Sequence, residues 1–170
     1  MIRSFTPAIA AVVAGTVLSF SLDQTRRVAV LEDQKHKTYA TRGNIREFHR
    51  YYREGEKLGE GTFAVVKRGV NLSTKEHVAI KEIDKGKSDE ECRANEVQVM
   101  EKMGRHPNLI GLHNIYESDE QLFIVQDLAE GGELFERIVR AGELSENEAA
   151  KLFKDAVTAV DHLHSKNIAQ

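Results

Sequence analysis

Leu58-Gly-Glu-Gly-Thr-Phe-Ala-Val-Val-Lys67 is the stretch that decides the fold of this chain, together with the later Val78-Ala-Ile-Lys81. Its two glycines carry no Cβ, so the backbone there can turn tightly and approach a ligand. The β-branched run from Val65 to Val70 predicts a strand, whereas a dinucleotide-binding glycine loop would open a helix. The stretch therefore predicts a glycine-rich β-hairpin, and residues 77–83 predict a third strand.

Lys81 ends the apolar triplet of the third predicted strand. An ammonium group at that point can reach phosphates held under the hairpin. A Gly-x-Gly-x-x-Ala pattern alone is a weak indication of phosphate binding. The lysine at this distance, on a strand, makes the indication strong.

The two stretches resemble the nucleotide-binding lobe of the protein kinases, whose signature is Gly-x-Gly-x-x-Gly-x-Val followed by Val-Ala-Ile-Lys. Here Ala64 takes the place of the third glycine. The resemblance implies that the chain binds ATP and that Lys81 directs the phosphates. The residues implied for this contact are Leu58, Gly59, Glu60, Gly61, Thr62, Phe63, Ala64, Val66, Ala79 and Lys81.

Glu96 is the second catalytic residue that the resemblance implies, because the family places a glutamate on the next helix to pair with this lysine. Three other carboxylates compete for the role: Glu90, Glu91 and Glu101. The run Asn95-Glu96-Val97, with His106-Pro107-Asn108 after it, resembles the family's pattern and favours Glu96. Without the resemblance, Glu96 would be interpreted as a solvated helix carboxylate.

Residues 127–135, Asp-Leu-Ala-Glu-Gly-Gly-Glu-Leu-Phe, resemble the hinge between the two lobes of the family. The resemblance implies that backbone groups of Asp127 and Ala129 bind the adenine edge and that Glu133 binds the ribose. Gln126 stands at the gatekeeper position, where apolar residues or Thr are more usual. The Gly-Gly-Glu-Leu-Phe run is typical of the calcium/calmodulin-dependent group of Ser/Thr kinases.

The predicted fold class is α+β, with a kinase-like N-terminal lobe of five antiparallel strands and one helix between residues 51 and 127. The helix is expected at about 88–103, because Ser88 and Glu91 have the spacing of a capping box. Residues 128–170 are expected to give the first helices of an incomplete C-terminal lobe. These are a short helix from Leu134 to Arg140 and a longer one at 145–165, which opens at a second capping box, Ser145 with Glu148.

The sequence stops where the family's His-Arg-Asp motif would begin, with Gln170 at the histidine position. The catalytic loop and the Asp-Phe-Gly site that bind substrate and Mg²⁺ are not among these residues. We therefore expect a truncated kinase domain that is inactive as it stands, with Mg²⁺ implied only by the family. The alternative is a pseudokinase-like interaction module, in which a protein partner covers the apolar stripe of the helix at 145–165.

Composition excludes several other classes. The 170 residues carry a net charge of −3, and the pI of about 6.2 gives no global argument for nucleic-acid binding. Cys92 is the single cysteine, so an internal disulfide is impossible. The sequence shows no Cys/His cluster with metal-ligand spacing.

Residues 1–22 are largely apolar and form the first of three expected segments. Two interpretations stay open: a short anchor that contacts a membrane on its cytoplasmic side, and a cleaved secretory or mitochondrial targeting peptide. Residues 23–50 are expected to be a polar, basic linker, although Ile45, Phe48 and Tyr51 have the spacing of a helical turn that docks on the domain. The partial kinase domain is expected at 51–170.

Overall fold

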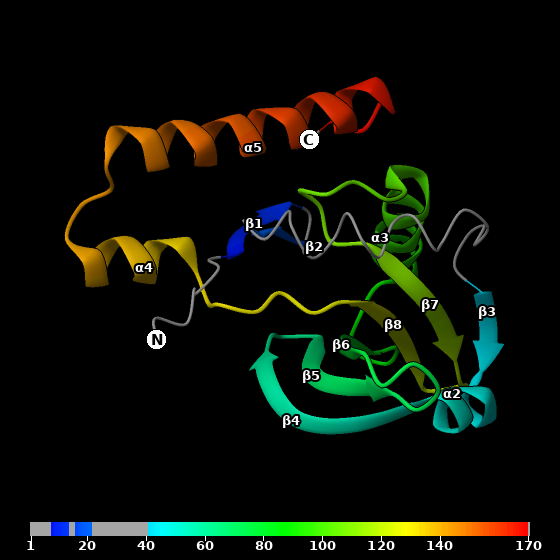
Figure 1. The fold of residues 1–170 in the computed structure, drawn as a ribbon. Helices are drawn as coiled ribbons and strands as arrows, with labels where there is room; N and C mark the ends of the chain where they lie inside the picture. The colour runs from blue at the N-terminus through cyan, green and yellow to red at the C-terminus, as the bar shows by residue number, and fades with distance from the viewer. Residues whose placement is uncertain (1–7, 14–15, 22–40, 170) are drawn as a thin grey trace. The chain divides into compact units, whose positions relative to one another are not determined.

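The computed structural model describes residues 8–13, 16–21 and 41–169 (Figure 1). The chain divides into two compact units, each described here by itself. Among the described residues, the sheet unit comprises 41–104 and 111–128, and the helical unit contains 105–110 and 129–169 together with 8–13 and 16–21. The described parts of residues 1–22 form a hairpin of two antiparallel strands, β1 (Ala8–Val13) and β2 (Thr16–Ser21).

Six strands form the sheet of the sheet unit, in the order β3-β7-β8-β6-β5-β4. Their bounds are β3 (Thr41–Asn44), β4 (Tyr52–Glu60), β5 (Ala64–Asn71), β6 (His77–Asp84), β7 (Leu112–Glu117) and β8 (Gln121–Asp127). The five strands from β4 to β8 pair antiparallel, as predicted. The prediction of a five-stranded, wholly antiparallel sheet is wrong in one respect, because β3 joins its edge parallel to β7. The run Thr-Arg-Gly-Asn of β3 has no apolar alternation, so edge pairing rather than its own pattern makes it a strand.

The first hairpin has the predicted geometry. Strands β4 and β5 are joined by a tight turn in which the Gly61 amide donates to the Ala64 carbonyl at 2.8 Å. Gly59 pairs with Val66 and Glu60 with Val65, so the glycine-rich stretch belongs to a β-hairpin and does not open a helix.

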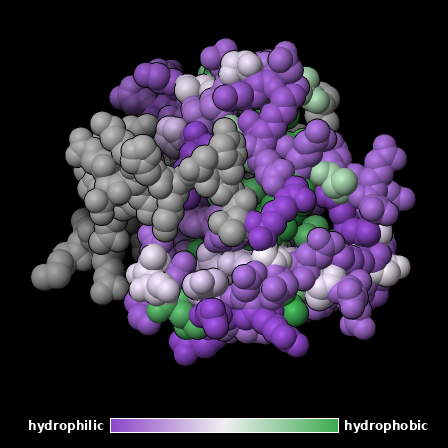
Figure 2. Space-filling model, turned by 90° about the vertical axis from the view of Figure 1, so that its right-hand side faces the viewer, coloured by the Kyte–Doolittle hydropathy of each residue, from purple (hydrophilic) through white to green (hydrophobic). Residues whose placement is uncertain are grey.

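Helix α2 (Ile45–Tyr51) covers one face of this sheet. A capping box starts it: the Asn44 side chain accepts from the amides of Arg46 and Glu47, and the Glu47 carboxylate accepts from the Asn44 amide. The fully buried Phe48 ring stacks on Phe123, with 4.7 Å between ring centroids. Part of the stretch expected to be a linker is thus a strand and a helix packed on the sheet. Figure 2 shows the side of the molecule that lies at the right of Figure 1, and the described surface there is mostly hydrophilic.

Phe48 belongs to an aromatic cluster that we define as Phe48, Tyr52, Tyr116 and Phe123. The Phe48 ring lies 6.0 Å from Tyr52 and meets Tyr116 edge-on at 5.6 Å. The apolar side chains of Val78, Ile80 and Val125 complete the core on this face. Of the expected docking turn, Phe48 is fully buried and Ile45 packs against the cluster, whereas Tyr51 is 43% exposed and its carbonyl accepts from the Leu72 amide at 2.8 Å.

Helix α3 (Glu90–Met103) buries Val97, Met100 and Met103. The predicted cap at Ser88 is wrong, because Asp89 is the N-cap and its carboxylate accepts from the Glu91 amide at 2.8 Å. The Ser88 hydroxyl instead donates to the Asp84 carbonyl at 2.6 Å, which closes the turn before the helix.

In the helical unit, α4 (Leu134–Ala141) precedes α5 (Glu146–Ser165). The predicted capping box of Ser145 and Glu148 starts α5, and Glu148 also pairs with Arg137 of α4 at 3.2 Å. Leu152, Ala159 and Leu163 of α5 are buried. None of the helices in the described part of the chain is long and apolar enough to cross a membrane.

Replacing Phe48 by alanine should lower the free energy of unfolding by about 3–5 kcal/mol, because the change removes a buried ring and leaves a cavity among three other aromatic rings. Urea denaturation measures this loss. Phe63→Ala is the control, since the Phe63 side chain is about half exposed at 53%. An equal, small effect of both substitutions would show that α2 contributes no packing energy to the sheet.

Candidate functional site

The face of the sheet opposite the aromatic cluster carries the candidate site. Lys81 of β6 stands between Val66 of β5 and Ile124 of β8 in the strand register. Residues directly opposite each other point to the same side of a sheet, and so does the next residue but one, Ala79. Gly59 pairs with Val66 and therefore borders this face too. Four of the predicted contact residues thus lie on one surface.

Lys81 and Glu96 form an ion pair between this face and α3. The Lys81 Nζ lies 2.5 Å from Glu96 Oε1, and the two side chains are only 13% and 11% exposed. Because charges so far removed from water are costly to leave unpaired, each of the two needs the other. The structure also separates the competing carboxylates: Glu90 and Glu91 lie in the first turn of α3, and Glu101 pairs with Arg42.

Arg93 fixes the first turns of α3. Its Nη1 donates to the Lys85 carbonyl at 3.2 Å and to the Ser88 hydroxyl at 2.9 Å, and it also contacts the Ser88 carbonyl. Glu96 follows one turn later on the same helix. Sequence reasoning missed Arg93, because a charged residue in the first turns of a helix is usually solvated and its spacing gives no signal.

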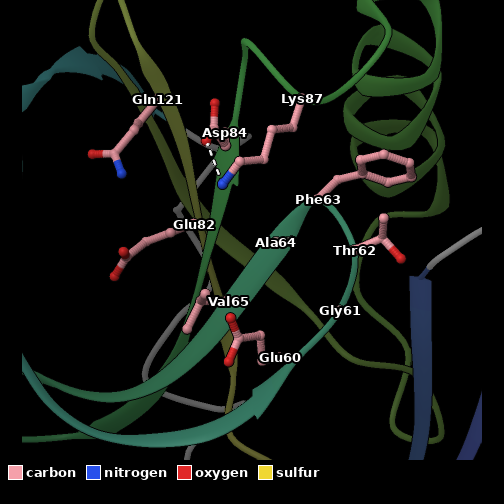
Figure 3. Close-up of a pocket in the computed structure, with 10 residues that line it drawn as sticks. All are labelled: Glu60, Gly61, Thr62, Phe63, Ala64, Val65, Glu82, Asp84, Lys87 and Gln121. Carbon is pink, nitrogen blue, oxygen red and sulfur yellow. Dashed lines mark ion pairs between the residues drawn. The ribbon is translucent and has the colours of Figure 1, made fainter.

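The glycine loop leaves open space beside it. A Cβ built on Gly59 would meet no atom within 4 Å, so nothing in the described chain occupies that position. A pocket of about 200 Å³ does lie at the loop (Figure 3) and includes residues 60–65. Its other walls are Glu82, Asp84, Lys87 and Gln121, and Lys87 reaches Asp84 at 3.1 Å. Lys81 and Glu96 do not line it, so this pocket is distinct from the face that carries the ion pair.

Asp127 ends β8 in a small polar network. Its amide donates to the Gly111 carbonyl at 2.9 Å, and its carboxylate accepts from the Gly111 amide and contacts His113 Nε2, both at 2.7 Å. A Cβ at Gly111 would lie 2.8 Å from the carboxylate, so this approach requires glycine. Sequence reasoning missed Gly111 and His113, which stand 14 to 16 residues away from Asp127.

The remaining predicted contact residues are divided between the units. Gln126 is buried, on the same side of the sheet as Ala79, its partner in the register. Ala129 and Glu133 belong to the helical unit, where Glu133 is the N-cap of α4 without a side-chain capping bond. The structure therefore brings Gly59, Val66 and Ala79 together with the Lys81–Glu96 pair. Residues 60–64 line the separate pocket, and Ala129 and Glu133 belong to the other unit.

The face of the sheet that carries the aromatic cluster also carries a second charged group, formed by Glu54, Lys67 and Glu82. The Lys67 ammonium lies 2.7 Å from both carboxylates. Burial and the neighbouring Glu54 raise the pKa of Glu82 to about 7. Hydrogen bonding to Glu82 and to Lys67 lowers the pKa of Glu54. One carboxyl of the pair consequently holds a proton up to near neutral pH while the other is ionised.

The comparisons with known proteins all indicate the same family. Residues 52–170 match the family described as protein kinase domain. Myosin light chain kinase A of Dictyostelium discoideum is 42% identical over 125 residues, which are 72% of this chain and 42% of that protein. CBL-interacting protein kinase 8 of Oryza sativa subsp. japonica is 38% identical over 121 residues, 69% of this chain and 27% of that protein.

Calcium-dependent protein kinase 5 of Plasmodium berghei (strain Anka) is 42% identical over 113 residues, which cover 66% of this chain and 20% of that protein. The chain thus spans less than half the length of each of these relatives. The matched part includes the hairpin, Lys81, Glu96 and the segment that follows β8.

Replacing Glu82 by glutamine should change how stability depends on pH. With a folded-state pKa of about 7 and an ordinary value of 4.5, the folded chain keeps a proton that the unfolded chain releases. The stability that this bound proton contributes to the folded state is complete below pH 4.5 and is lost as pH rises through 7. The free energy of unfolding of Glu82→Gln, relative to that of the wild type, should therefore rise by about 1 kcal/mol between pH 5.5 and 8. The rise is smaller than the whole pKa shift implies, because solvent screens the group.

Urea denaturation of both proteins across this pH range measures the difference. Glu120→Gln, at an exposed turn position, is the matched control. A difference between Glu82→Gln and wild type that stays constant with pH would contradict the assignment of a carboxyl that titrates near neutrality.

Proposed function

Because the chain belongs to the protein kinase family, in the group similar to the calcium/calmodulin-dependent kinases, we propose that residues 52–170 are the ATP-binding part of a Ser/Thr protein kinase. The observation that carries the proposal is the Lys81–Glu96 ion pair on the face bordered by the glycine loop. In this family the lysine directs the phosphates and the glutamate orients the lysine.

The phosphate end of the proposed site consists of the glycine loop and Lys81. The paired Glu96 holds the Lys81 ammonium at a fixed point beside Val66 and Ala79. The space next to Gly59 lets the backbone approach a ligand without a side chain between them. A fixed cation beside accessible backbone fits the chemistry of a polyphosphate anion.

The adenine end is assigned to the segment that follows β8. We assign the base to backbone groups of Asp127 and Ala129, and the ribose to Glu133. The Asp127 amide already donates to Gly111, so a contact from Asp127 would use its carbonyl oxygen. The side chain of Gln126 is buried and places a polar amide at the inner end of the proposed adenine site. An apolar residue at this position would favour ligands that are apolar there, because a buried polar group needs a hydrogen-bond partner.

Phosphoryl transfer needs groups that these 170 residues do not include. The family positions the acceptor hydroxyl with the Asp of His-Arg-Asp and binds Mg²⁺ with an Asn and the Asp of Asp-Phe-Gly. Bound Mg²⁺ would neutralise charge on the phosphates, and we assign none of the residues in this sequence to it. We therefore propose that a polypeptide of these residues binds ATP without transferring its terminal phosphoryl group.

A second candidate function, a non-catalytic interaction module, is favoured by apolar side chains on the two helices of the helical unit. Phe135 of α4 and Phe153 of α5 are each 72% exposed, and Val139, Val157 and Val160 are also exposed. Apolar surface of this kind marks interaction sites in soluble proteins. The exposed stripe on residues 145–165 suits a protein partner with an apolar surface. If the chain stays monomeric at high concentration, and also when another kinase is added, this candidate function is contradicted.

ATP binding should be weak and largely independent of Mg²⁺. At a Kd of about 1 mM the binding free energy is only about −4 kcal/mol. Lys81→Met should weaken binding by about tenfold or more, since a hydrogen bond to a charged group contributes about 1.5–3 kcal/mol. Titration calorimetry with and without Mg²⁺ measures both effects.

Lys75→Met is the control for this measurement, because Lys75 is exposed on the connection between β5 and β6 and does not line the glycine loop. Submicromolar, Mg²⁺-dependent binding would contradict the proposed incomplete site. Equal losses in the two lysine variants would contradict the assignment of Lys81 to the phosphates.

Phosphoryl transfer by the 170-residue polypeptide should not exceed background. Positioning and charge stabilisation supply nearly all the catalysis of this reaction, so losing the groups that provide both should be close to a total loss. The measurement is transfer of radiolabelled phosphate from ATP to Ser- and Thr-containing peptides. Transfer above background that Lys81→Met abolishes would overturn this part of the proposal.

A further inference from the structure

The position of α3 decides whether Glu96 reaches Lys81. Both side chains of the pair are almost fully covered, so a small shift of the helix would break the contact or leave a buried charge without a partner. Arg93 holds the beginning of α3 on the preceding turn. A helix that is held only at its N-terminal end can still move at its C-terminal end. A second attachment near that end would fix the position of Glu96.

The segment of residues 41–52, which we call the brace, supplies a rigid base for such an attachment. It consists of β3, α2 and the first residue of β4. The ring of Phe48 is fully buried within the aromatic cluster, and the Tyr52 hydroxyl donates to Asn114 Oδ1 at 2.6 Å. After β3, the brace is therefore anchored to the sheet through Phe48 and Tyr52.

Strand β3 has no room for a side chain at Gly43. Gly43 pairs with Tyr116, and a Cβ built on Gly43 would come within 2.5 Å of Glu47 Oε2 and 2.9 Å of the Tyr116 ring. A side chain at this position would displace the Glu47 carboxylate, which caps α2, or the Tyr116 ring of the aromatic cluster. The adjacent residue, Arg42, is thus held at a fixed distance from the edge of the sheet.

Arg42 extends from β3 to the last turns of α3. Its Nε and Nη2 donate to Glu101 Oε1 at 3.2 and 3.1 Å, and Nη2 also lies 3.2 Å from Oε2. An exposed ion pair usually contributes little, but a two-pronged arginine–carboxylate pair is the favourable exception. Glu101 follows Glu96 by five residues, about 7.5 Å along the helix axis at the usual rise per residue.

We propose that the brace positions α3, and that Arg42 is a positioning residue that keeps Glu96 on Lys81. Glu96 then lies between two attachments: Arg93 on the N-terminal side and the Arg42–Glu101 pair on the C-terminal side. The role concerns the Lys81–Glu96 pair itself and does not depend on nucleotide binding. Residues 41–51 of the brace lie before residue 52, where the match to the kinase family model begins.

Distance measurements between spin labels on the full chain test the proposal. Cys92→Ser removes the single thiol, and Gln98→Cys on α3 with Ser73→Cys on the β5–β6 turn provide two exposed labelling positions. Arg42→Ala should widen the distribution of distances between the labels. Exchanging the charges, with Arg42→Glu and Glu101→Arg together, should restore a narrow distribution.

Hydrogen exchange gives an independent measure that needs no labels. Amides of residues 97–103 should exchange about fivefold faster in Arg42→Ala, which is about 1 kcal/mol at 1.4 kcal/mol per tenfold change. Arg46→Ala, which removes an exposed arginine from the same brace, is the matched control and should change neither measurement. Unchanged distances and unchanged exchange in Arg42→Ala would overturn the proposal.

A double-mutant cycle separates positioning from a general effect on stability. The coupling between Lys81→Met and Glu96→Gln is measured by urea denaturation in the wild-type and Arg42→Ala backgrounds. A positioning role predicts a smaller coupling when Arg42 is absent. If Arg42→Ala lowers the stability of all variants equally and leaves the coupling intact, Arg42 is only a surface contact and the proposal fails.

Discussion

The Lys81–Glu96 ion pair is the interaction on which the rest of the sheet unit depends. Two nearly covered charges meet at 2.5 Å, between a central strand and α3. Moving such charges out of water is costly, and only good geometry with the partner recovers the cost. The surrounding structure therefore has to hold a helix and a sheet in one relative position, which Arg93 and the methionine-rich apolar side of α3 help to do.

The two-residue period of a strand gives this sheet two different faces. In β6, Ile80 points to the aromatic cluster and Lys81, the next residue, points to the ion pair. The same alternation puts Val66 beside Lys81, and Val65 beside Glu82. A packed core on one face can thus keep the strands rigid while the other face stays available for chemistry. A one-residue slip in register would exchange the two sets of side chains.

Much of this arrangement could be predicted from local pattern. The β-hairpin follows from two glycines before a β-branched run, and α5 follows from the spacing of Ser145 and Glu148. Long-range features could not be predicted in this way. Arg42 meets Glu101 across 59 residues, and β3 forms because the edge of β7 offers unpaired backbone groups. The cap of α3 lies one residue after the predicted Ser88, because the Ser88 hydroxyl donates to the Asp84 carbonyl and the Asp89 carboxylate accepts from the Glu91 amide.

The aromatic cluster also bears on where this domain can be cut. The match to the family model begins at residue 52, yet Phe48 completes the packing of Phe123 and Tyr116 from outside that boundary. A recombinant fragment starting at Tyr52 would carry every residue assigned to ATP and still expose two aromatic rings to water. Exposed rings on a sheet surface promote self-association. The packed core of the sheet unit therefore extends beyond the residues that the family model matches.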